Sequence, residues 1–417
     1  MTESVAVVDK APPPAGLPQV VVRPRRAQPF FGRHPWVFAG AIASVTGNPA
    51  PGDEVALVSD KREFIARGLF NPHSGIRVRL YNWDAATPLD EAFWRGRLER
   101  AIELRRDQLQ WWGPETACRV VFSEADGLSG LVVDRYGDWL LVQCTSLALY
   151  RRRELLLRLL NELLSPRGIW LRTEKGIREA EGLEAADQLL SGESPPRPLF
   201  IEEHGLRFSV DVVEGQKTGF FLDQRLNRQA FVNYAGPGRM LDLCCFSGGF
   251  ALQAARLPQV TEVVAVDVSA PSLEMAARNA ELNGLAHRVR FQKGDAFKTL
   301  EAMNHAGEKF ATIVLDPPKL ARHGAGLQEA LRGYHSLNRM AMELISPGGT
   351  LVTCSCTGHV TRPMFEQMLA DAASSAKRHV QVLESRGAAP DHPVSAHCSE
   401  TAYLKCLICR VLCHGLA

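Results

Sequence analysis

The sequence lacks any long apolar run, and this absence excludes an integral helical membrane protein. No stretch approaches the roughly 18 consecutive apolar residues that a helix needs to span a bilayer, although 46% of the 417 residues are hydrophobic. The first residues, MTESVAVVDKAPPPAGLP, contain neither a basic cluster nor a long apolar core. They are expected to form a flexible tail rather than a signal peptide, so we expect a cytoplasmic protein that does not bind membranes.

Cysteine is scarce, and neither sign of charge dominates. Ten cysteines are too few for a disulfide scaffold in a chain of this length, so each is by default a small buried hydrophobic residue. The net charge is only +2, yet four arginines and no acid occur between residues 22 and 33. Such a local excess can meet a phosphate backbone, although a solvated surface is an equally good reading of charge alone.

The length and the turn signals predict several domains. Short strands between residues 20 and 81 predict a small all-β module, and a helical pattern follows up to about Trp112. Strands and a long helix over 148–164 then predict an α/β unit, and SGESPPRP at 191–198 is the best linker candidate. The predicted divisions are a tail (1–18), a β domain (19–96), a middle α/β domain (97–195) and a C-terminal domain (196–417).

In the C-terminal domain, strands alternate with helices, which predicts a doubly wound, mostly parallel sheet whose ligand lies at the carboxyl ends of the strands. The first strand runs into CCFSGGFAL, where Gly248 and Gly249 permit a sharp turn and a close approach of backbone to ligand. Carboxylates follow three successive strands, at Asp242, Asp267 and Asp295. Because the turn is not G-x-G-x-x-G, a nicotinamide dinucleotide is disfavoured.

The three carboxylates suit an adenosine. Asp267 lies 19 positions beyond Gly248, where a carboxylate can accept both hydroxyls of a ribose. Asp295 is placed to accept a hydrogen bond from an adenine amino group. Helix capping is the alternative role for both Asp267 and Asp295.

The fourth strand ends in LDPPKL, in which two prolines fix the backbone after Asp316. The turn DLCCFSGGF resembles the first motif of class I methyltransferases, whose ligand S-adenosylmethionine carries an electrophilic methyl group. A rigid acceptor beside that methyl group suits an amino group or a ring nitrogen of a substrate. The motif alone leaves nitrogen and carbon targets open.

The fifth strand ends in TCSCTGH and brings Cys354 and Cys356 to the edge that carries Asp316. Carbon 5 of a pyrimidine is a poor nucleophile, so an enzyme that methylates it first adds a thiolate to carbon 6. The strand should end near Ser355, which favours Cys356 as the nucleophile and Cys354 as packing. Two buried thiols remain the plain alternative. A metal site is not expected, because Cys406 and Cys409 lie on opposite faces of a predicted strand.

Over nearly its whole length the chain resembles the RlmI-type 23S ribosomal RNA cytosine-C5 methyltransferases. GRHPWVF at 32–38 resembles their PUA domain, EEHGLRFSVDVVEGQKTGFFLDQR at 202–225 their lead-in to the catalytic domain, and Cys356 the cysteine of their strand-five motif. The resemblance implies a PUA-like β-barrel, a small α/β middle domain and a Rossmann-like class I methyltransferase sheet, seven-stranded and mostly parallel. It also implies S-adenosylmethionine as cofactor and 23S rRNA or a large-subunit assembly intermediate as partner; a homodimer is a further expectation.

The strand-end motifs and the resemblance together assign roles to particular positions. Catalysis is expected of Cys356 and Asp316. Cofactor binding is expected of Lys217, Phe220, Asp223, Arg225, Asp242, Phe246, Gly248, Gly249, Asp267, Asp295 and Asp316. RNA binding is expected of Arg23, Arg33, His34, Trp36, Lys319 and Tyr334. Its DHPV loop, Asp391–Val394 here, is expected at the rim of the pocket.

The chain also departs from the family's pattern. Cys244, Cys245 and Ser247 replace an aromatic residue and a Tyr-Thr pair in the first motif, which alters the lining of the methionine site. Other RNA cytosine methyltransferases have Pro-Cys after strand four, where this chain and its family do not, so the base that removes the carbon-5 proton stays open between Asp316 and water. Three other functions stay open: guanine-nitrogen methylation of rRNA, a non-catalytic rRNA-binding assembly factor, and methylation of a small molecule.

Overall fold

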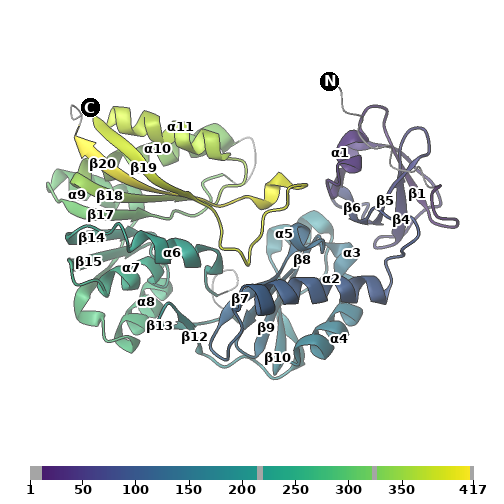
Figure 1. Cartoon of the computed structure of the whole chain (residues 1–417), viewed down its shortest axis with the longest axis horizontal. Helices are drawn as coiled ribbons and strands as arrows, with labels where there is room; N and C mark the ends of the chain where they lie inside the picture. The colour runs from purple at the N-terminus through teal and green to yellow at the C-terminus, as the bar shows by residue number, and fades with distance from the viewer. Residues whose placement is uncertain (1–11, 214–218, 322–325, 414–417) are drawn as a thin grey trace. The chain divides into compact units, whose positions relative to one another are not determined.

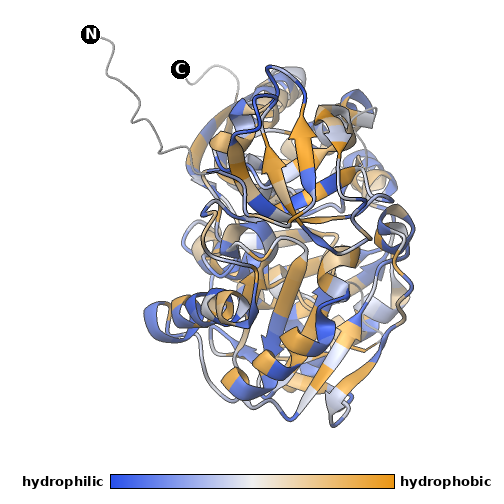
Figure 2. Cartoon of the chain, turned by 90° about the vertical axis from the view of Figure 1, so that its right-hand side faces the viewer, coloured by the Kyte–Doolittle hydropathy of each residue, from blue (hydrophilic) through white to orange (hydrophobic). Residues whose placement is uncertain are grey.

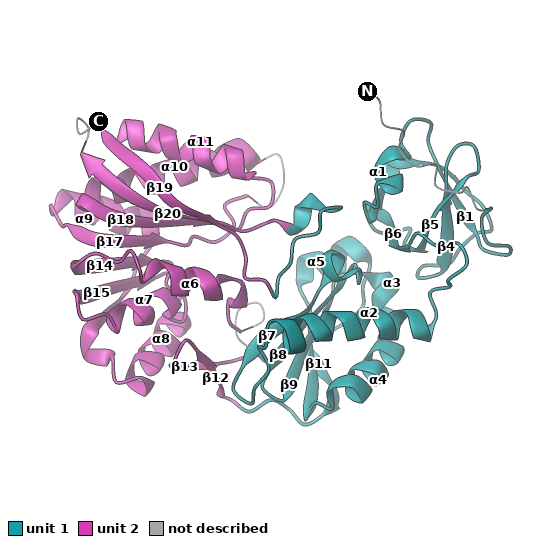
Figure 3. Cartoon of the chain, in the orientation of Figure 1, with its two compact units in different colours: residues 1–196, 212–218, 391–401 teal, residues 197–211, 219–390, 402–417 magenta. Residues whose placement is uncertain are grey.

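The computed structural model describes residues 12–213, 219–321 and 326–413. The chain divides into two compact units, which Figure 3 distinguishes by colour. Unit 1 comprises residues 1–196, 212–218 and 391–401, and unit 2 comprises residues 197–211, 219–390 and 402–417. Each unit is built around its own sheets and is described separately.

Unit 1 begins with a six-stranded sheet in the order β2-β6-β5-β4-β1-β3. Its pairs are antiparallel except for β1 and β4, which are parallel. A short helix α1 (Gln28–Phe31) precedes β2. The strands are β1 (Gln19–Val22), β2 (Trp36–Phe38), β3 (Ile42–Val45), β4 (Glu54–Val58), β5 (Phe64–Phe70) and β6 (Ile76–Asn82). The small all-β module expected from the turn signals is confirmed.

A second sheet of unit 1 has five strands in the order β11-β10-β9-β8-β7. Asp90 caps its first helix by accepting a hydrogen bond from the Phe93 N–H at 3.0 Å, since an N-cap carboxylate satisfies a donor that the helix leaves open. The strands are β7 (Ala117–Phe122), β8 (Leu131–Tyr136), β9 (Trp139–Cys144), β10 (Gly168–Arg172) and β11 (Gln188–Gly192). The helices are α2 (Glu91–Glu103), α3 (Leu147–Tyr150), α4 (Arg153–Leu164) and α5 (Lys175–Glu181).

Two predictions for this region were wrong in detail. The single helix expected over 148–164 is two helices, α3 and α4, because Arg152 leaves the helical conformation and donates a hydrogen bond from Nη1 to the Gly52 carbonyl at 2.7 Å. The linker expected at 191–198 begins inside β11, where Ser191 and Gly192 pair with β10.

Unit 2 contains a seven-stranded sheet in the order β16-β15-β14-β17-β18-β20-β19 (Figure 1). Its first five strands run parallel, and β20 is antiparallel to both β18 and β19. The sheet strands are β14 (Gly238–Leu243), β15 (Val260–Asp267), β16 (Val289–Lys293), β17 (Phe310–Leu315), β18 (Ile345–Ser355), β19 (Arg378–Arg386) and β20 (Lys405–Cys413). A hairpin of β12 (Leu199–Glu203) and β13 (Leu206–Val210) precedes it. The doubly wound, mostly parallel sheet is confirmed.

Helices cover both faces of this sheet, because right-handed crossovers change face where the strand order reverses, after β16. Residues of α9, α10 and α11 join one large core cluster with the sheet, whereas α7 and α8 contact β14, β15 and β16 (Figure 1). The helices are α6 (Arg225–Phe231), α7 (Gly249–Ala255), α8 (Ala270–Leu282), α9 (Ala296–His305), α10 (Leu327–Leu344) and α11 (Arg362–Ser375).

Hydrophobic residues concentrate on the strands, and the helices alternate between hydrophobic and hydrophilic residues (Figure 2). This is the pattern of helices that bury one face against a sheet. Among the helices that the structure describes, none combines the length and the apolar character that crossing a bilayer requires.

The segment 391–401 belongs to unit 1 although it lies between β19 and β20 in sequence. Asp391 is fully buried there, and its Oδ2 accepts a hydrogen bond from the Arg119 N–H at 3.0 Å. Its carbonyl accepts another from the buried Arg105 at 2.7 Å. The sequence predicted a single C-terminal domain over all of 196–417, whereas the structure assigns 391–401 to unit 1. The DHPV loop, which begins this segment, contributes to the packing of unit 1.

Candidate active site

The turn between β14 and α7 is held by a buried carboxylate. Asp242, the penultimate residue of β14, accepts a hydrogen bond from the Ala251 N–H at 2.9 Å and so holds the first turn of α7. Gly248 has φ +86°, a conformation that residues with a Cβ rarely adopt. A Cβ on Gly249 would lie 2.8 Å from Cδ of Arg228, so this position is closed to side chains by packing.

Asp242 is an unusual carboxylate. Burial, followed by the charge of Asp316, raises its pKa to about 8. Its Oδ1 is buried and has no hydrogen-bond partner among the described residues. A buried polar atom that the protein leaves without a partner suits a ligand that offers it a hydrogen-bonding group.

Asp267 and Asp295 follow neighbouring strands, as expected, and both also cap local structure. Asp267 ends β15 and accepts from the Phe246 N–H at 2.9 Å and the Ser269 N–H at 2.8 Å. Asp295 is the N-cap of α9 and accepts with Oδ1 from Phe297 and Lys298, both at 3.1 Å. Capping and ligand binding are compatible at Asp295, because its Oδ2 is not used by these two bonds.

An apolar surface accompanies the carboxylates. Phe246 has φ +49° and packs edge to face on Phe221, with ring centroids 5.0 Å apart. Val268, which directly follows Asp267, is 62% exposed. The sequence reasoning missed Val268, although an apolar residue directly after a strand-end carboxylate is a signal that could have found it.

The stretch 216–225 is described only from Gly219 onward, so Lys217 lies outside the described residues. Phe220 is buried and packs on Phe208, with ring centroids 5.0 Å apart. Asp223 accepts a hydrogen bond from the Tyr403 hydroxyl. Gln224 donates from Nε2 to Oδ2 of Asp316 at 3.0 Å, which ties this stretch to the end of β17.

A buried ion pair that the sequence reasoning missed supports the same stretch. Arg228 binds Glu203 through two bonds, Nε to Oε1 at 2.6 Å and Nη2 to Oε2 at 2.8 Å, and also donates to the Phe221 carbonyl at 2.9 Å. Arg225 lies 3.5 Å from the same carboxylate and is 5% exposed. The charge of Arg225 is thus balanced inside the protein, and its expected contact with the cofactor stays a prediction.

Asp316 and Cys356 meet at the carboxyl ends of β17 and β18. Asp316 follows β17, and its N–H donates to the Leu243 carbonyl at 3.3 Å. Cys356 follows β18, which ends at Ser355 as predicted, and its Sγ lies 3.9 Å from the Pro317 carbonyl oxygen. The thiol therefore lies against the Asp-Pro-Pro turn.

The two cysteines differ in environment. Cys354 is fully buried opposite Cys406, and a hydrogen bond with Cys406, followed by burial, raises its pKa well above the usual value. Cys356 is only half-buried. A nucleophile must be both accessible and ionisable, so the environments favour Cys356.

The two residues of unit 2 expected to bind RNA have opposite environments. Lys319 is exposed just after the Asp-Pro-Pro turn. Tyr334 is fully buried, and its hydroxyl lies 2.9 Å from Oγ1 of Thr357. Tyr334 therefore supports the backbone after Cys356, and the expected RNA contact does not agree with its burial.

The RNA-binding candidates of unit 1 lie in and around the first sheet. Arg23 and Arg33 are exposed, and Arg23 donates from Nε to the Ile42 carbonyl at 2.9 Å. His34 and Trp36 are half-buried, with their rings edge to face. The Trp36 indole N–H donates to Oε1 of Glu124 at 2.9 Å, so part of this motif serves packing within unit 1.

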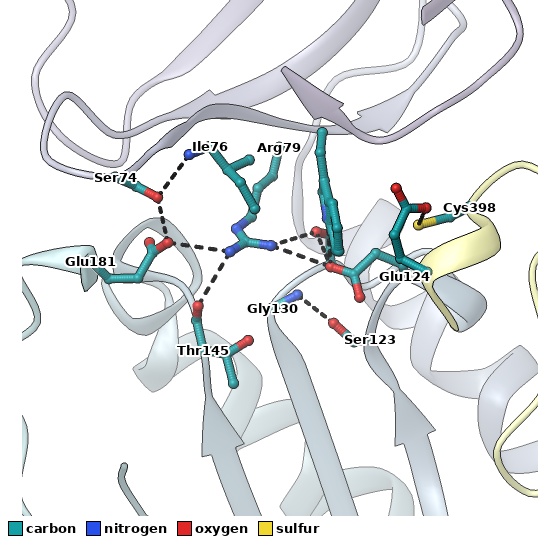
Figure 4. A network of polar contacts seen from close by, with 12 residues as sticks. Ser74, Ile76, Arg79, Ser123, Glu124, Gly130, Thr145, Glu181 and Cys398 are labelled. Atoms are coloured by element: carbon teal, nitrogen blue, oxygen red, sulfur yellow. Dashed lines mark hydrogen bonds and ion pairs between the residues drawn. The ribbon is translucent and has the colours of Figure 1, made fainter. Parts of the chain in front are cut away.

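A buried polar network joins the two sheets of unit 1 (Figure 4). Arg79 on β6 lies 3.2 Å from an oxygen of Glu124 and 3.2 Å from an oxygen of Glu181. Ser74 donates to Glu181 at 2.6 Å, and Ser129 donates to Glu124 at 2.7 Å. One guanidinium thus balances two carboxylates between the sheets.

His34, Cys398 and Glu400 form a cluster with ligand atoms within 4.8 Å of one another. Nδ1 of His34 accepts the Trp36 N–H at 3.3 Å, so a neutral ring carries its proton on Nε2 and donates it to Glu400. A metal-bound histidine has the reverse arrangement, with the free nitrogen donating. Hydrogen bonds therefore account for this cluster.

Comparisons with known proteins agree with this fold. Residues 177–410 match the family model of S-adenosylmethionine-dependent methyltransferases, and residues 20–83 match that of PUA-like domains. A candidate S-adenosylmethionine-dependent methyltransferase from Streptococcus mutans superposes with a TM-score of 0.80 at 18% identity, over 94% of this chain and 99% of its own. A second candidate methyltransferase, solved with S-adenosylhomocysteine, gives 0.81 at 20% identity and the same coverage. The matched family model and the fold define the class of protein: an S-adenosylmethionine-dependent methyltransferase.

Curated relatives narrow the class. A ribosomal RNA large subunit methyltransferase I from Erwinia tasmaniensis is 38% identical over 395 residues, which cover 94% of this chain and 99% of the relative. The protein of the same name from Aeromonas salmonicida is 40% identical over 386 residues, covering 92% and 97%. The chain belongs to the ribosomal RNA large subunit methyltransferase I family of S-adenosylmethionine-dependent methyltransferases.

Proposed function

We propose that this protein methylates carbon 5 of a cytosine in 23S rRNA through a transient adduct of Cys356. The observation that carries the proposal is the half-buried Cys356 thiol, 3.9 Å from the Pro317 carbonyl of the Asp-Pro-Pro turn. A thiol at this edge of the sheet has a use in carbon-5 chemistry and none in direct transfer to a nitrogen. The family name of the relatives supports a large-subunit rRNA as substrate.

S-adenosylmethionine, when bound, supplies the electrophilic methyl group. Asp267 would hold the ribose and Asp295 the adenine, with Phe246 and Val268 as apolar neighbours. The unsatisfied Oδ1 of Asp242 supports a ligand with a hydrogen-bonding group beside the glycine turn. Because Gly248 and Gly249 have no side chains, the protein backbone at that turn can come close to the ligand. Lys217, Phe220, Asp223 and Arg225 remain candidates for the methionine end.

The chemistry of the protein's own residues follows from the target. The Cys356 thiolate adds to carbon 6, which makes carbon 5 enamine-like and able to take the methyl group. A base then removes the proton from carbon 5, and the C6–S bond breaks to return the thiolate. Asp316 and water are the candidate bases, and Asp316 is held by Gln224 at 3.0 Å.

RNA recognition is proposed for the PUA-like sheet and for the exposed cations. Arg23, Arg33 and Lys319 are exposed and can meet phosphates, while His34 and Trp36 supply a ring surface. We propose a cytoplasmic protein that acts on 23S rRNA or on a large-subunit assembly intermediate. A homodimer stays a prediction, which light scattering of the purified protein would test.

Methyl transfer to 23S rRNA tests the proposal. Purified protein with radiolabelled S-adenosylmethionine and unmethylated 23S rRNA should yield 5-methylcytidine after digestion to nucleosides. Cys356→Ser should abolish the product, and Cys354→Ser, a matched control two residues away, should retain it. Methylguanosine as the product, with full activity of Cys356→Ser, would reject carbon 5 as the target. Rejection of catalysis altogether would follow if the protein bound rRNA without binding the cofactor.

A further inference from the structure

A lysine lies buried directly beside the strand end that carries Cys356. Lys405 is the first residue of β20, and it pairs with Ser355, the last residue of β18. It is 2% exposed. Lysine is almost never fully buried unless a partner offsets the loss of hydration, so this position needs an explanation.

The ammonium group is held by backbone carbonyls rather than by a carboxylate. Nζ donates to the Thr357 carbonyl at 2.7 Å and to the Tyr403 carbonyl at 2.7 Å. A lysine has three N–H donors, so these two bonds leave one. Among the described residues, no Asp or Glu oxygen lies within ion-pair distance of Lys405.

The backbone that holds Lys405 is itself fixed next to Cys356. Thr357 follows Cys356, is fully buried and contacts the Tyr334 hydroxyl through its own side chain at 2.9 Å. Tyr334 in turn packs edge to face on Phe365, with ring centroids 5.5 Å apart. The carbonyl that positions the ammonium thus has little freedom to move.

The charged neighbours of Lys405 point to Cys356 as its counterpart. Burial lowers the pKa of Lys405 to about 8, while Cys356 opposes that shift and the cations Arg362 and Lys319 add to it. Arg362 is engaged with Oγ of Ser385 and the Arg386 carbonyl, and Lys319 is exposed. Of the three cations Lys405, Arg362 and Lys319, Lys405 is therefore the buried one.

We propose that Lys405 is a positioning residue that stabilises the thiolate form of Cys356 by its charge and by holding the backbone at Thr357. A thiolate, not a thiol, is the nucleophile, and a nearby cation favours that form. The thiol proton leaves to solvent, and no other bond is made or broken in this step. The inference rests on the proposed role of Cys356 and deepens it.

The rate at which iodoacetamide alkylates Cys356, followed by peptide mass spectrometry across a range of pH, tests this proposal. In the wild-type protein the midpoint of the profile should lie below the value of about 8.5 for an ordinary thiol. Lys405→Gln keeps a donor for the two carbonyls but removes the charge, and should raise the midpoint by about one unit, equal to about tenfold less thiolate at neutral pH. Lys405→Arg should restore most of the wild-type profile.

The control is Lys309→Gln, because Lys309 also donates to a carbonyl, that of Glu343 at 2.8 Å, but is exposed. Its profile should match the wild type. Calorimetry with S-adenosylhomocysteine checks that each variant retains its fold. A wild-type midpoint at or above that of an ordinary thiol, or a Lys405→Gln profile identical to the wild type, would overturn the inference.

Methyl transfer to rRNA separates this inference from the proposed function. If Lys405→Gln left the alkylation midpoint of Cys356 unchanged while Cys356→Ser still abolished methyl transfer, only the role of Lys405 would be rejected. If Lys405→Gln raised the alkylation midpoint of Cys356 while Cys356→Ser remained fully active in methyl transfer, only the adduct chemistry would be rejected.

Discussion

Replacing Glu203 by glutamine removes the charge that balances two buried arginines. Glu203 is 3% exposed and binds Arg228 through two bonds of 2.6 and 2.8 Å, with Arg225 3.5 Å away. Removal of one partner from a buried pair leaves an uncompensated charge and destabilises by about 3–5 kcal/mol. Since glutamine can still accept one hydrogen bond, we expect a loss near 3 kcal/mol. The matched control is Glu202→Gln, because Glu202 is the exposed neighbour on β12.

Hydrogen exchange of peptides from α6 and α7 measures this effect within unit 2. A loss near 3 kcal/mol corresponds to exchange faster by on the order of 10²-fold. All 7 tryptophans precede residue 197, so tryptophan fluorescence during urea unfolding reports on unit 1 alone and should be nearly unchanged. If these peptides exchanged more slowly in Glu203→Gln than in Glu202→Gln, or less than about fivefold faster, the reasoning about the buried pair would be refuted.

The same variant should change the response to acid. Burial would raise the pKa of Glu203, but Arg228 and Arg225 outweigh it, so the net shift is downward from 4.5. The contribution to stability is therefore present above pH 4.5 and is lost as the pH falls through the lower value of the folded protein. Glu203→Gln should lack this acid dependence.

Three other substitutions test separate parts of the account. Arg79→Met should destabilise unit 1 by about 3–5 kcal/mol in tryptophan-monitored urea unfolding, because two buried carboxylates lose their cation; an unchanged midpoint would contradict this. Asp242 has its pKa raised from 3.8 to about 8, so the protein should lose stability as the pH rises between these values, and Asp242→Asn should flatten that dependence in thermal scans. Gly249→Ala places a Cβ 2.8 Å from Cδ of Arg228 and should weaken S-adenosylhomocysteine binding at least about tenfold. Gly358→Ala, which meets nothing within 4 Å, should leave binding unchanged.

The sequence predicted most of the fold because its signals were local. Strand alternation, turn residues and strand-end motifs placed β14, β15, β17 and β18 and brought Asp316 and Cys356 to one edge. The choice of Cys356 over Cys354 as the exposed thiol also followed from the end of the strand near Ser355.

What the sequence did not predict depends on contacts between distant segments. Glu203 and Arg228 look like surface charges in sequence, and only the packing of β12 against α6 reveals a buried pair. Lys405 lies 48 positions from Thr357, and in the sequence it is only a charged residue at the start of a predicted strand. The assignment of 391–401 to unit 1 rests on the contacts of Asp391 with Arg119 and Arg105, for which the sequence carries no periodic signal.

The most direct test of the central claim is a covalent trap. RNA that carries 5-fluorocytidine at the target position accepts the thiolate and the methyl group, but fluorine cannot leave as a proton does, so the C6–S bond should persist. Denaturing electrophoresis should show an RNA–protein adduct that needs S-adenosylmethionine, with Cys356 as the modified residue and no adduct for Cys356→Ser. An equally abundant adduct with Cys356→Ser, or an adduct mapped to Cys354, would contradict the account.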